Sequence, residues 1–408
     1  MITIKILFIT WNCFLKQDII DTLKELGHSV SLFEINDDEM DYRFTPTSKC
    51  RLVKKLKENP VNLIFSMNYF PTVSEAANEI KIKYISWVYD NPFMKLYSIN
   101  IINECNYIFT FEKDIAQKLQ QQHVKTVYYA PLAVLVSRLS SVNNGNHTEQ
   151  EKPIDVSFVG SLYNEKAPFY KQLVEKLRSA GDHYTVGYLE AIIEAQLRIY
   201  GYYLLENSLT DSLMQKITAV HPLIYDEFAH FLEPKTFVSD FWLAKEVTRR
   251  ERFMLLEQIS SRFQTYLYTP NRDAQVGKCM NKGYVRYYDE MPLVFHHSKI
   301  NLNITLKSIR TGIPLRALDI MASGGFLLSN YQEDLIQYFT PGQDFVIYES
   351  TSDAIQKIDY YLSNEAERIQ IAENGKRKIE ENFSLKKRLA DMLSIVSETN
   401  RTEIRRIE

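Results

Sequence analysis

The chain has 408 residues, enough for two or three domains that each bury a core, and its net charge of -3 gives no global basic field for nucleic acid. Hydrophobic residues make up 45% and charged residues 24%, and the four scattered cysteines show no metal-ligand spacing, so we expect a globular protein with free thiols and no metal site. The N-terminal run Ile2–Ile9 carries Lys5 and has no cleavage site, and no apolar run approaches the roughly 20 residues of a membrane span. These features predict a cytoplasmic enzyme or binding protein without a transmembrane segment.

Short apolar segments alternate with helical patterns through residues 1–140. The predicted strands are Ile4–Thr10, Val30–Ile35, Asn62–Met67, Lys83–Tyr89, Tyr107–Phe111 and Thr126–Ala130. The predicted helices are Gln17–Leu26, Cys50–Glu58, Val73–Ile80 and Lys113–Gln122. This alternation indicates right-handed βαβ units and a parallel sheet, so we assign 1–140 to an α/β domain of Rossmann-like type.

A polar stretch without periodicity, 141–153, predicts a linker to a second α/β domain over 154–375. The strands predicted there are Asp155–Ser161, Thr265–Tyr268, Lys299–Ile304, Phe326–Ser329 and Asp344–Tyr348. Residues 187–263 are helical in pattern and longer than one crossover needs, so we predict a helical insertion. It either shapes an acceptor site or makes a homodimer contact, and the sequence leaves both open. Residues 376–408 are predicted to form amphipathic C-terminal helices.

The stretch Ser308–Asn330 is typical of a loop, a helix, a two-glycine turn and a buried strand. Arg310 and Gly312 lie in the loop, and Arg316 lies near the helix start, where an anion would also meet the helix N-terminus. Asp319 follows one turn later, where a carboxylate can accept two hydrogen bonds from a ribose diol. The alternative is that Arg316 and Asp319 only pair with each other on a solvated helix face.

The turn after the first strand of the second domain is another candidate site. Gly160 there would let a phosphate approach backbone N–H groups, with Ser161 and Tyr163 alongside and Lys166 supplying charge. An ordinary strand-to-helix turn explains the same residues. Because GxGxxG and Walker patterns are missing from the sequence, dinucleotide binding and P-loop hydrolysis lose support.

Two further residues have one functional and one structural interpretation each. Asp90 ends a strand and would serve as a general base, or would make an Asx-turn before Pro92. Tyr287 would stack on a nucleotide base, or would pack in the core. The histidines show no metal-ligand pattern.

Taken together, these segments resemble the spore-maturation-protein CgeB-like glycosyltransferases, a bacterial family of the GT-B fold. The resemblance covers nearly the whole chain and rests on Gly27–His28, Ser86–Pro92, Phe158–Ser161, Lys299–Thr305, Gly312–Gly325 and Ala372–Gly375. It implies two Rossmann-like domains facing across a cleft, with a C-terminal helix that crosses back to the first domain. The acceptor would bind to the first domain, 1–140, and the nucleotide-sugar donor to the second, 154–375.

The resemblance also implies an activity, which is metal-independent transfer of a sugar from a nucleotide-sugar donor to a glycan or protein acceptor. The donor would be a UDP-sugar such as UDP-GlcNAc or UDP-glucose, with no other cofactor. Asp319 falls at the ribose-binding position, where glutamate is usual. Ser161 stands where many relatives have arginine, so Arg310, Arg316 or Lys166 would hold the diphosphate.

Several points stay open in this interpretation. The residue seven or eight before Asp319, often a second glutamate in retaining relatives, is Thr311 or Gly312 here, so retention and inversion are both open. The catalytic base would come from the first domain, as Asp90. The competing functions are a sugar-nucleotide epimerase on the same fold and a non-catalytic nucleotide- or sugar-binding protein.

Overall fold

The computed structural model describes residues 3–35, 46–141, 153–164, 168–223, 225 and 229–397. Lys166 and residues 142–152 of the predicted linker lie outside these ranges. The chain divides into two compact units, each built on one six-stranded sheet. The first unit comprises Met1–Leu135, Tyr225–Leu232 and Phe383–Glu408, and the second comprises Val136–Ile224 and Glu233–Asn382.

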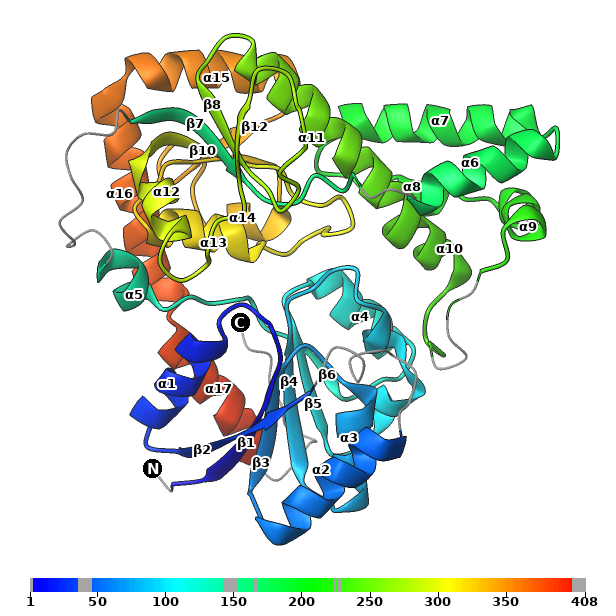
Figure 1. The fold of residues 1–408 in the computed structure, drawn as a ribbon, viewed down its shortest axis with the longest axis vertical. Coiled ribbons are helices and arrows are strands. Elements are labelled where there is room, and N and C mark those ends of the chain that lie inside the picture. Colours follow the sequence, from blue (N-terminus) through cyan, green and yellow to red (C-terminus); the bar gives the residue numbers. More distant parts are fainter. Residues whose placement is uncertain are drawn as a thin grey trace. The chain divides into compact units, whose positions relative to one another are not determined.

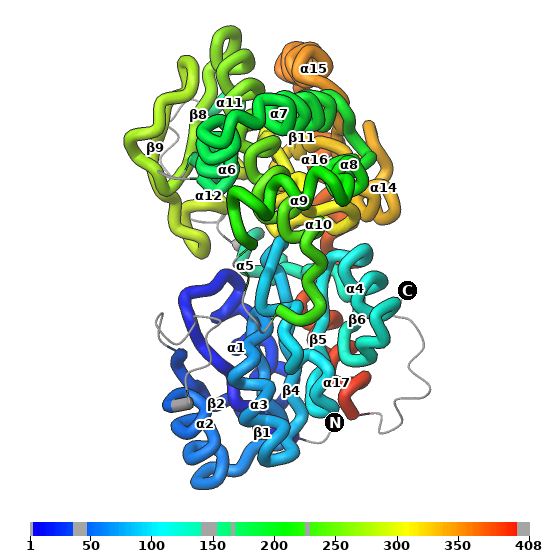
Figure 2. Tube along the Cα trace, turned by 90° about the vertical axis from the view of Figure 1, so that its right-hand side faces the viewer, coloured from blue at the N-terminus to red at the C-terminus, as the bar shows by residue number. Residues whose placement is uncertain are grey.

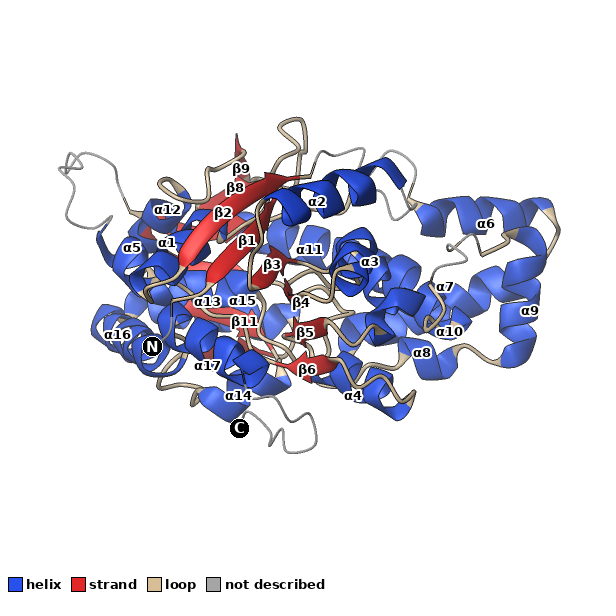
Figure 3. Ribbon diagram, turned by 90° about the horizontal axis from the view of Figure 1, so that it is seen from below, coloured by secondary structure: helices blue, strands red, loops and turns tan. Residues whose placement is uncertain are grey.

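All six predicted strands of the first unit are confirmed, and they pair in parallel in the order β2-β1-β3-β4-β5-β6 (Figure 3). Their bounds are β1 (Lys5–Thr10), β2 (Ser29–Glu34), β3 (Leu63–Met67), β4 (Lys83–Val88), β5 (Asn106–Thr110) and β6 (Val127–Tyr129). The central strands β3 and β5 are buried along their whole length, as expected for a parallel sheet covered on both faces.

Helices cover both faces of this sheet, with α1 and α17 on one and α2 and α3 on the other (Figure 1). The bounds are α1 (Lys16–Glu25), α2 (Pro46–Glu58), α3 (Pro71–Glu79), α4 (Lys113–Gln121) and α17 (Leu385–Ser397), with 3₁₀ turns at Met94–Tyr97 and Ile99–Ile102. The C-terminal segment is joined to this unit because Val134 donates its N–H to the carbonyl of Phe383 at 3.0 Å. The C-terminal helix therefore belongs to the first unit, as predicted.

The second unit has a parallel sheet in the order β12-β11-β10-β7-β8-β9. The bounds are β7 (Ile154–Val159), β8 (Thr265–Tyr268), β9 (Met280–Gly283), β10 (Ser298–Asn303), β11 (Leu327–Asn330) and β12 (Val346–Tyr348). Five of these were predicted and β9 was not. Its sequence, Met-Asn-Lys-Gly, lies at the sheet edge and is largely exposed, so it carries no apolar run.

The helical insertion was predicted over 187–263, and in the structure helices follow one another from α6 to α11, so the helical region begins before residue 187. Figure 2 shows α6 to α10 gathered side by side. The bounds are α6 (Phe169–Ser179), α7 (His183–Arg198), α8 (Leu205–Ser208), α9 (Asp211–Val220), α10 (Pro234–Thr236), a π-helix (Phe237–Leu243) and α11 (Ala244–Ser260). One segment inside this range, Tyr225–Leu232, belongs to the first unit instead, where Phe231 donates its N–H to the carbonyl of Tyr97 at 3.0 Å.

The remaining helices of the second unit flank its sheet. Their bounds are α5 (Val136–Ser141), α12 (Met291–His297), α13 (Leu315–Ala322), α14 (Glu333–Tyr338), α15 (Thr351–Ser363) and α16 (Glu365–Asn382). The unit begins at Val136, a few residues before the predicted boundary at 140, because Arg138 of α5 lies over the ring of Tyr287 at 4.9 Å.

Each sheet has one point where the strand order reverses. In the first unit β1 lies between β2 and β3, and in the second unit β7 lies between β8 and β10. The loops after the two strands diverge at such a point and leave a crevice at the carboxyl ends, where α/β proteins bind their ligands. The predicted site residues can be tested against these two positions.

Candidate functional sites

The first candidate site lies at the reversal point of the second unit, where Gly160 follows β7. Gly160 has φ +156°, and a β-carbon there would lie 3.1 Å from the guanidinium carbon of Arg316. Arg316 is the second residue of α13, and its guanidinium also lies over the ring of Phe158 at 5.2 Å. The structure therefore brings Gly160 and Arg316 together, although they are far apart in sequence.

Arg252 of α11 is a second cation at this point, and the sequence interpretation missed it. It is buried and donates to the carbonyl of Ser161 after β7 and, at 2.6 Å, to the carbonyl of Ile304 after β10. Arg252 thus joins the two loops that diverge at the reversal point. One signal was available, because Arg252 is in helical phase with the buried Leu255, Leu256 and Ile259.

Arg316 makes no salt bridge within the described residues, although the charge of Asp319 acts on it. Its Nη1 atom is buried, and the described part of the chain offers it no hydrogen-bond partner. Burial, together with the positive charge of Arg252, holds the pKa of Arg316 well below that of an ordinary arginine. A desolvated cation beside a second cation is an unfavourable arrangement that an anion would relieve.

Asp319 lies one turn further along α13 and is buried. The hydroxyl of Tyr287 donates to its Oδ1 atom at 3.3 Å, and the Tyr287 ring is covered by Arg138 at 4.9 Å. The alternative of an Arg316–Asp319 pair on a solvated helix face is not what the structure shows, because Asp319 is buried and no ion pair joins them. Tyr287 supports Asp319 with its hydroxyl. Its ring is buried and lies against the Arg138 guanidinium, and stacking on a nucleotide base stays a prediction.

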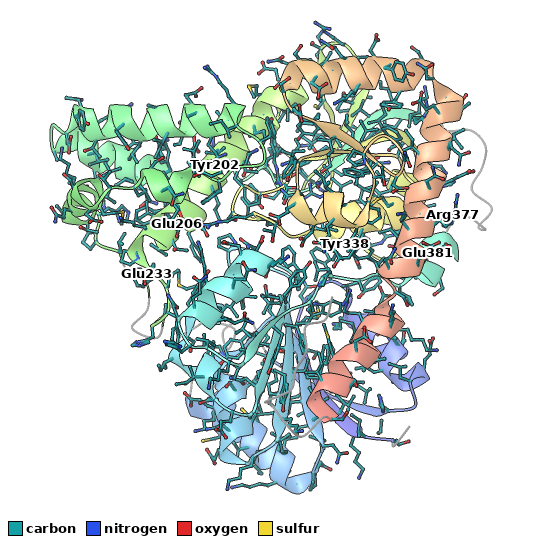
Figure 4. All side chains as sticks on the ribbon, turned by 180° about the vertical axis from the view of Figure 1, so that it is seen from behind. Tyr202, Glu206, Glu233, Tyr338, Arg377 and Glu381 are labelled. Atoms are coloured by element: carbon teal, nitrogen blue, oxygen red, sulfur yellow. The ribbon has the colours of Figure 1, made fainter. Side chains whose placement is uncertain are left out.

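Arg310 has partners that the sequence did not predict. Its Nη2 atom lies 2.8 Å from Oε2 of Glu206 and 3.1 Å from Oδ1 of Asp240, and its guanidinium lies over the Tyr203 ring at 4.2 Å. Figure 4 labels Glu206 on the helical insertion. The predicted role of Arg310 at a diphosphate therefore competes with two carboxylates that already neutralise its charge.

The other predicted residues of this site surround the same loops. Ser161 is exposed, and its hydroxyl accepts from the N–H of Tyr163 at 3.1 Å. Gly312 is buried in a loop that is fixed by a bond from the Asp334 N–H to the Thr311 carbonyl at 3.0 Å. Lys166 lies outside the described residues, so its predicted role stays a prediction.

The second candidate site lies in the first unit, where Asp90 follows β4. Asp90 is exposed, and its Oδ2 atom accepts from the Asn68 side-chain amide at 2.7 Å. The Oδ1 of Asn68 accepts in turn from the N–H of Tyr89 at 3.1 Å. The pKa of Asp90 is raised by desolvation, and the bond from Asn68 and the charge of Lys95 oppose this rise. The sequence interpretation missed Asn68, which has φ +60°, a conformation that asparagine tolerates better than most residues.

Within the described residues, no three His, Cys, Asp or Glu side chains are grouped so that they could hold a metal ion. No helix in the described part of the chain combines the length and apolarity needed to cross a membrane.

A family model described as glycosyl transferase-like matches residues 249–394. This segment contains Arg252, Arg316 and Asp319, and so includes most of the first candidate site. No curated protein matches the chain.

Solved structures match the chain over nearly its whole length at low identity. Sucrose-phosphate synthase from Thermosynechococcus elongatus aligns with a TM-score of 0.56 and 8% identity, covering 96% of this chain and 98% of that one. A glycosyltransferase from Rickettsia africae gives 0.51 and 14%, with coverage of 96% and 97%. The chain has the GT-B fold. The Anabaena protein HepE, solved in complex with UDP-glucose, also aligns with a TM-score of 0.51 and 9% identity, covering 97% of this chain and 99% of that one.

Proposed function

We propose that this protein is a CgeB-like glycosyltransferase that transfers a hexosyl or N-acetylhexosaminyl group from a UDP-sugar, such as UDP-glucose or UDP-GlcNAc, to a hydroxyl acceptor. The observation that carries the proposal is the half-buried Arg316 next to Arg252 at the reversal point of the second sheet, with a buried Nη1 atom that has no hydrogen-bond partner among the described residues. The GT-B fold and the family match over 249–394 agree with this activity. Because nucleotide sugars are made in the cytoplasm, the reaction would take place there.

The donor would bind to the second unit. Its diphosphate would lie against Arg316 and the backbone around Gly160, where the missing side chain allows close approach. Asp319 would accept from the ribose hydroxyls, with Tyr287 fixing the carboxylate. UDP is favoured as the nucleotide because HepE, a protein of the same fold, was solved with UDP-glucose.

In the transfer, the acceptor oxygen forms a bond to the anomeric carbon while the bond from that carbon to the diphosphate oxygen breaks. The acceptor proton goes to Asp90, and UDP leaves with the electron pair of the broken bond. The two guanidinium groups stabilise the negative charge that develops on the diphosphate, so no cofactor is needed for this role. The residues leave the stereochemical outcome open.

Calorimetric titration of the full chain with UDP and with the other nucleoside diphosphates tests the donor site. We expect UDP binding, weakened at least about tenfold in Arg316→Met, since a hydrogen bond to a charged group contributes about 1.5–3 kcal/mol. Arg286→Met is the matched control, because Arg286 is exposed and paired with Asp289 at 2.7 Å.

Thermal unfolding of the same variants separates a ligand role from a structural one. The Nη1 atom of Arg316 is buried without a hydrogen-bond partner and the residue lies close to Arg252, so Arg316→Met should raise the melting temperature of the ligand-free protein while it weakens UDP binding. A folded Arg316→Met variant that binds UDP as tightly as the wild type would disprove the donor site. Release of UDP with a new glycoside would support a transferase, whereas an epimerised UDP-sugar would support the epimerase.

A further inference from the structure

The first helix of the second unit carries an arginine that the proposed transfer reaction does not use. This helix, α5, begins where the chain enters the unit at Val136, and it packs against α13, the helix that carries Asp319. The guanidinium of Arg138 in α5 lies over two neighbouring rings, 4.9 Å from the centroid of Tyr287 and 5.2 Å from that of Tyr288. Its Nη1 atom also donates to the Tyr288 carbonyl at 3.3 Å, which joins segments 150 residues apart.

The ring of Tyr287 connects this arginine to the carboxylate of Asp319. Tyr288 meets the ring edge-on, with 5.1 Å between the centroids and 81° between the planes. The hydroxyl of Tyr287 donates to Oδ1 of Asp319 at 3.3 Å, and both residues are buried. A continuous series of contacts therefore runs from the guanidinium through one phenol to the carboxylate. We call Arg138, Tyr287 and Asp319 the relay.

A cation over a phenol ring affects the hydrogen bond that the phenol donates. The ring face is the negative part of its quadrupole, so the guanidinium is attracted to it and draws electron density away from the hydroxyl. The Tyr287 hydroxyl then becomes a stronger donor, and burial keeps water from screening the effect. At 3.3 Å its bond to Asp319 is longer than an ordinary O–H···O bond. The orientation of the carboxylate therefore depends on how firmly the ring is held and polarised.

We propose that Arg138 is a positioning residue for recognition of the donor ribose. It holds and polarises Tyr287, and Tyr287 orients the Asp319 carboxylate toward the ribose hydroxyls. The inference rests on the proposed function and adds to it a residue that lies outside the donor site.

The relay also links the ribose to the segment that connects the two units. Val134, two residues before α5, donates to the Phe383 carbonyl at 3.0 Å and accepts from the Leu385 N–H at 3.2 Å, where the chain returns to the first unit. Because coupling between two sites is reciprocal, a ribose held by Asp319 should in turn stabilise α5 through Arg138. Donor binding would thus be felt at the start of the second unit.

The preference for UDP over 2′-deoxy-UDP, measured by calorimetry on the full chain, is the first readout. It is a ratio of two affinities of one variant, so a loss of folded protein leaves it unchanged. We expect about a tenfold preference in the wild type. Arg138→Met removes the charge and should lower this preference about threefold, whereas Arg138→Lys keeps a cation and should retain most of it.

The matched control is Lys282→Met. Lys282 lies over the ring of Tyr266 at 4.5 Å in the same unit, and the Tyr266 hydroxyl accepts from the Gln264 side chain at 3.5 Å. The substitution removes a cation from a tyrosine ring outside the relay, so the preference should stay at the wild-type value.

A double variant shows whether Arg138 acts through Tyr287. In Tyr287→Phe the ring stays and the hydroxyl is lost, so adding Arg138→Met should produce no further fall in the preference. A fall of the same size in both backgrounds would overturn the relay, because Arg138 would then act by another route.

Hydrogen exchange of the backbone amides in residues 136–141 is the second readout. UDP should slow this exchange more than 2′-deoxy-UDP does at equal saturation, and the difference should disappear in Tyr287→Phe. This comparison does not depend on the folding of Arg138→Met. Equal protection by the two nucleotides in the wild type would contradict the link between the ribose and α5.

The outcomes separate this inference from the proposed function. A wild-type preference that is lost in Asp319→Asn and unchanged in Arg138→Met would overturn the role of Arg138 and leave the donor site standing. A wild-type chain that does not bind UDP would instead contradict the proposed function.

Discussion

The guanidinium of Arg316 packs against the bare backbone of Gly160, where a β-carbon would lie 3.1 Å from its Cζ atom. The close contact explains why a glycine with positive φ ends β7. The contact also fixes the Arg316 guanidinium at the point where the loops after β7 and β10 diverge. The second cation there, Arg252, is fixed by its hydrogen bonds to the carbonyls of Ser161 and Ile304. The geometry of the proposed diphosphate site thus depends on one missing side chain and one buried arginine.

Gly160→Ala tests this contact. We expect UDP affinity to fall about tenfold, because the new methyl group pushes the Arg316 guanidinium from its position. Gly181→Ala is the matched control in the same unit, since Gly181 has φ +75° but nothing within 4 Å of an added β-carbon. Both variants should lose at least about 1 kcal/mol of stability from backbone strain. Equal UDP affinity in the two variants, measured by calorimetry, would show that the contact is irrelevant to binding.

Arg310→Ala should destabilise the protein without weakening UDP binding. The substitution leaves the buried Asp240 and its neighbour Glu206 without their cation, which typically costs about 3–5 kcal/mol. Chemical denaturation measures the loss of stability, and calorimetry measures UDP affinity. A stable variant with weak UDP binding would restore the original prediction that Arg310 holds the diphosphate.

The loss of stability in Arg310→Ala should depend on pH. Desolvation raises the pKa of Asp240 and Arg310 opposes the rise, so removing Arg310 raises this pKa further. An acid whose pKa is higher in the folded state than in the unfolded state loses folding stability as pH rises through that interval. We therefore expect Arg310→Ala to lose more unfolding free energy, relative to the wild type, at pH 7 than at pH 5. The double variant Arg310→Met with Asp240→Asn should recover much of this lost stability. If the stability loss of Arg310→Ala did not change with pH, the titration of Asp240 would not be its cause.

Asp319 should make UDP binding depend on the hydroxyl groups of the ribose. The wild-type protein is expected to bind UDP about tenfold more tightly than 2′-deoxy-UDP, because a carboxylate loses one charge-assisted hydrogen bond with the deoxy ligand. In Asp319→Asn this preference should shrink, and in Tyr287→Phe it should shrink less, since only the bond at 3.3 Å is lost. An unchanged preference in Asp319→Asn would place the ribose elsewhere.

The pKa of Asp90 should set the pH at which kcat/KM falls on the acid side of its pH profile. As a general base it acts in its ionised form, and its raised pKa places the fall of kcat/KM at a higher pH than the ordinary aspartate value of about 3.9. Asn68→Gly removes the hydrogen bond that lowers this pKa and keeps the positive φ available, so the limb should move to still higher pH. Asp90→Asn should reduce turnover by about 100-fold with UDP affinity unchanged. If the acid-side fall of kcat/KM occurred at the same pH in Asn68→Gly as in the wild type, the titrating group would be a residue other than Asp90.

The amino-acid sequence alone determined most of the secondary structure, because strands such as β3 and β5 are local apolar runs between turn residues. It failed at β9, where an exposed edge strand has no apolar pattern. It also placed Arg316 and Asp319 correctly on one helix, since both follow a loop with Gly312 within a few residues.

Only the tertiary structure decided which side chains meet. Arg310 and Asp240 are 70 residues apart, Arg252 and Ser161 are 91 apart, and Asn68 and Asp90 are 22 apart. Periodicity reports which face of an element is buried, but it does not report which other element covers that face. The partner of a charged residue follows from strand order and helix packing, so the neutralised Arg310 and the unpaired Arg316 looked alike in the sequence and differ in the fold.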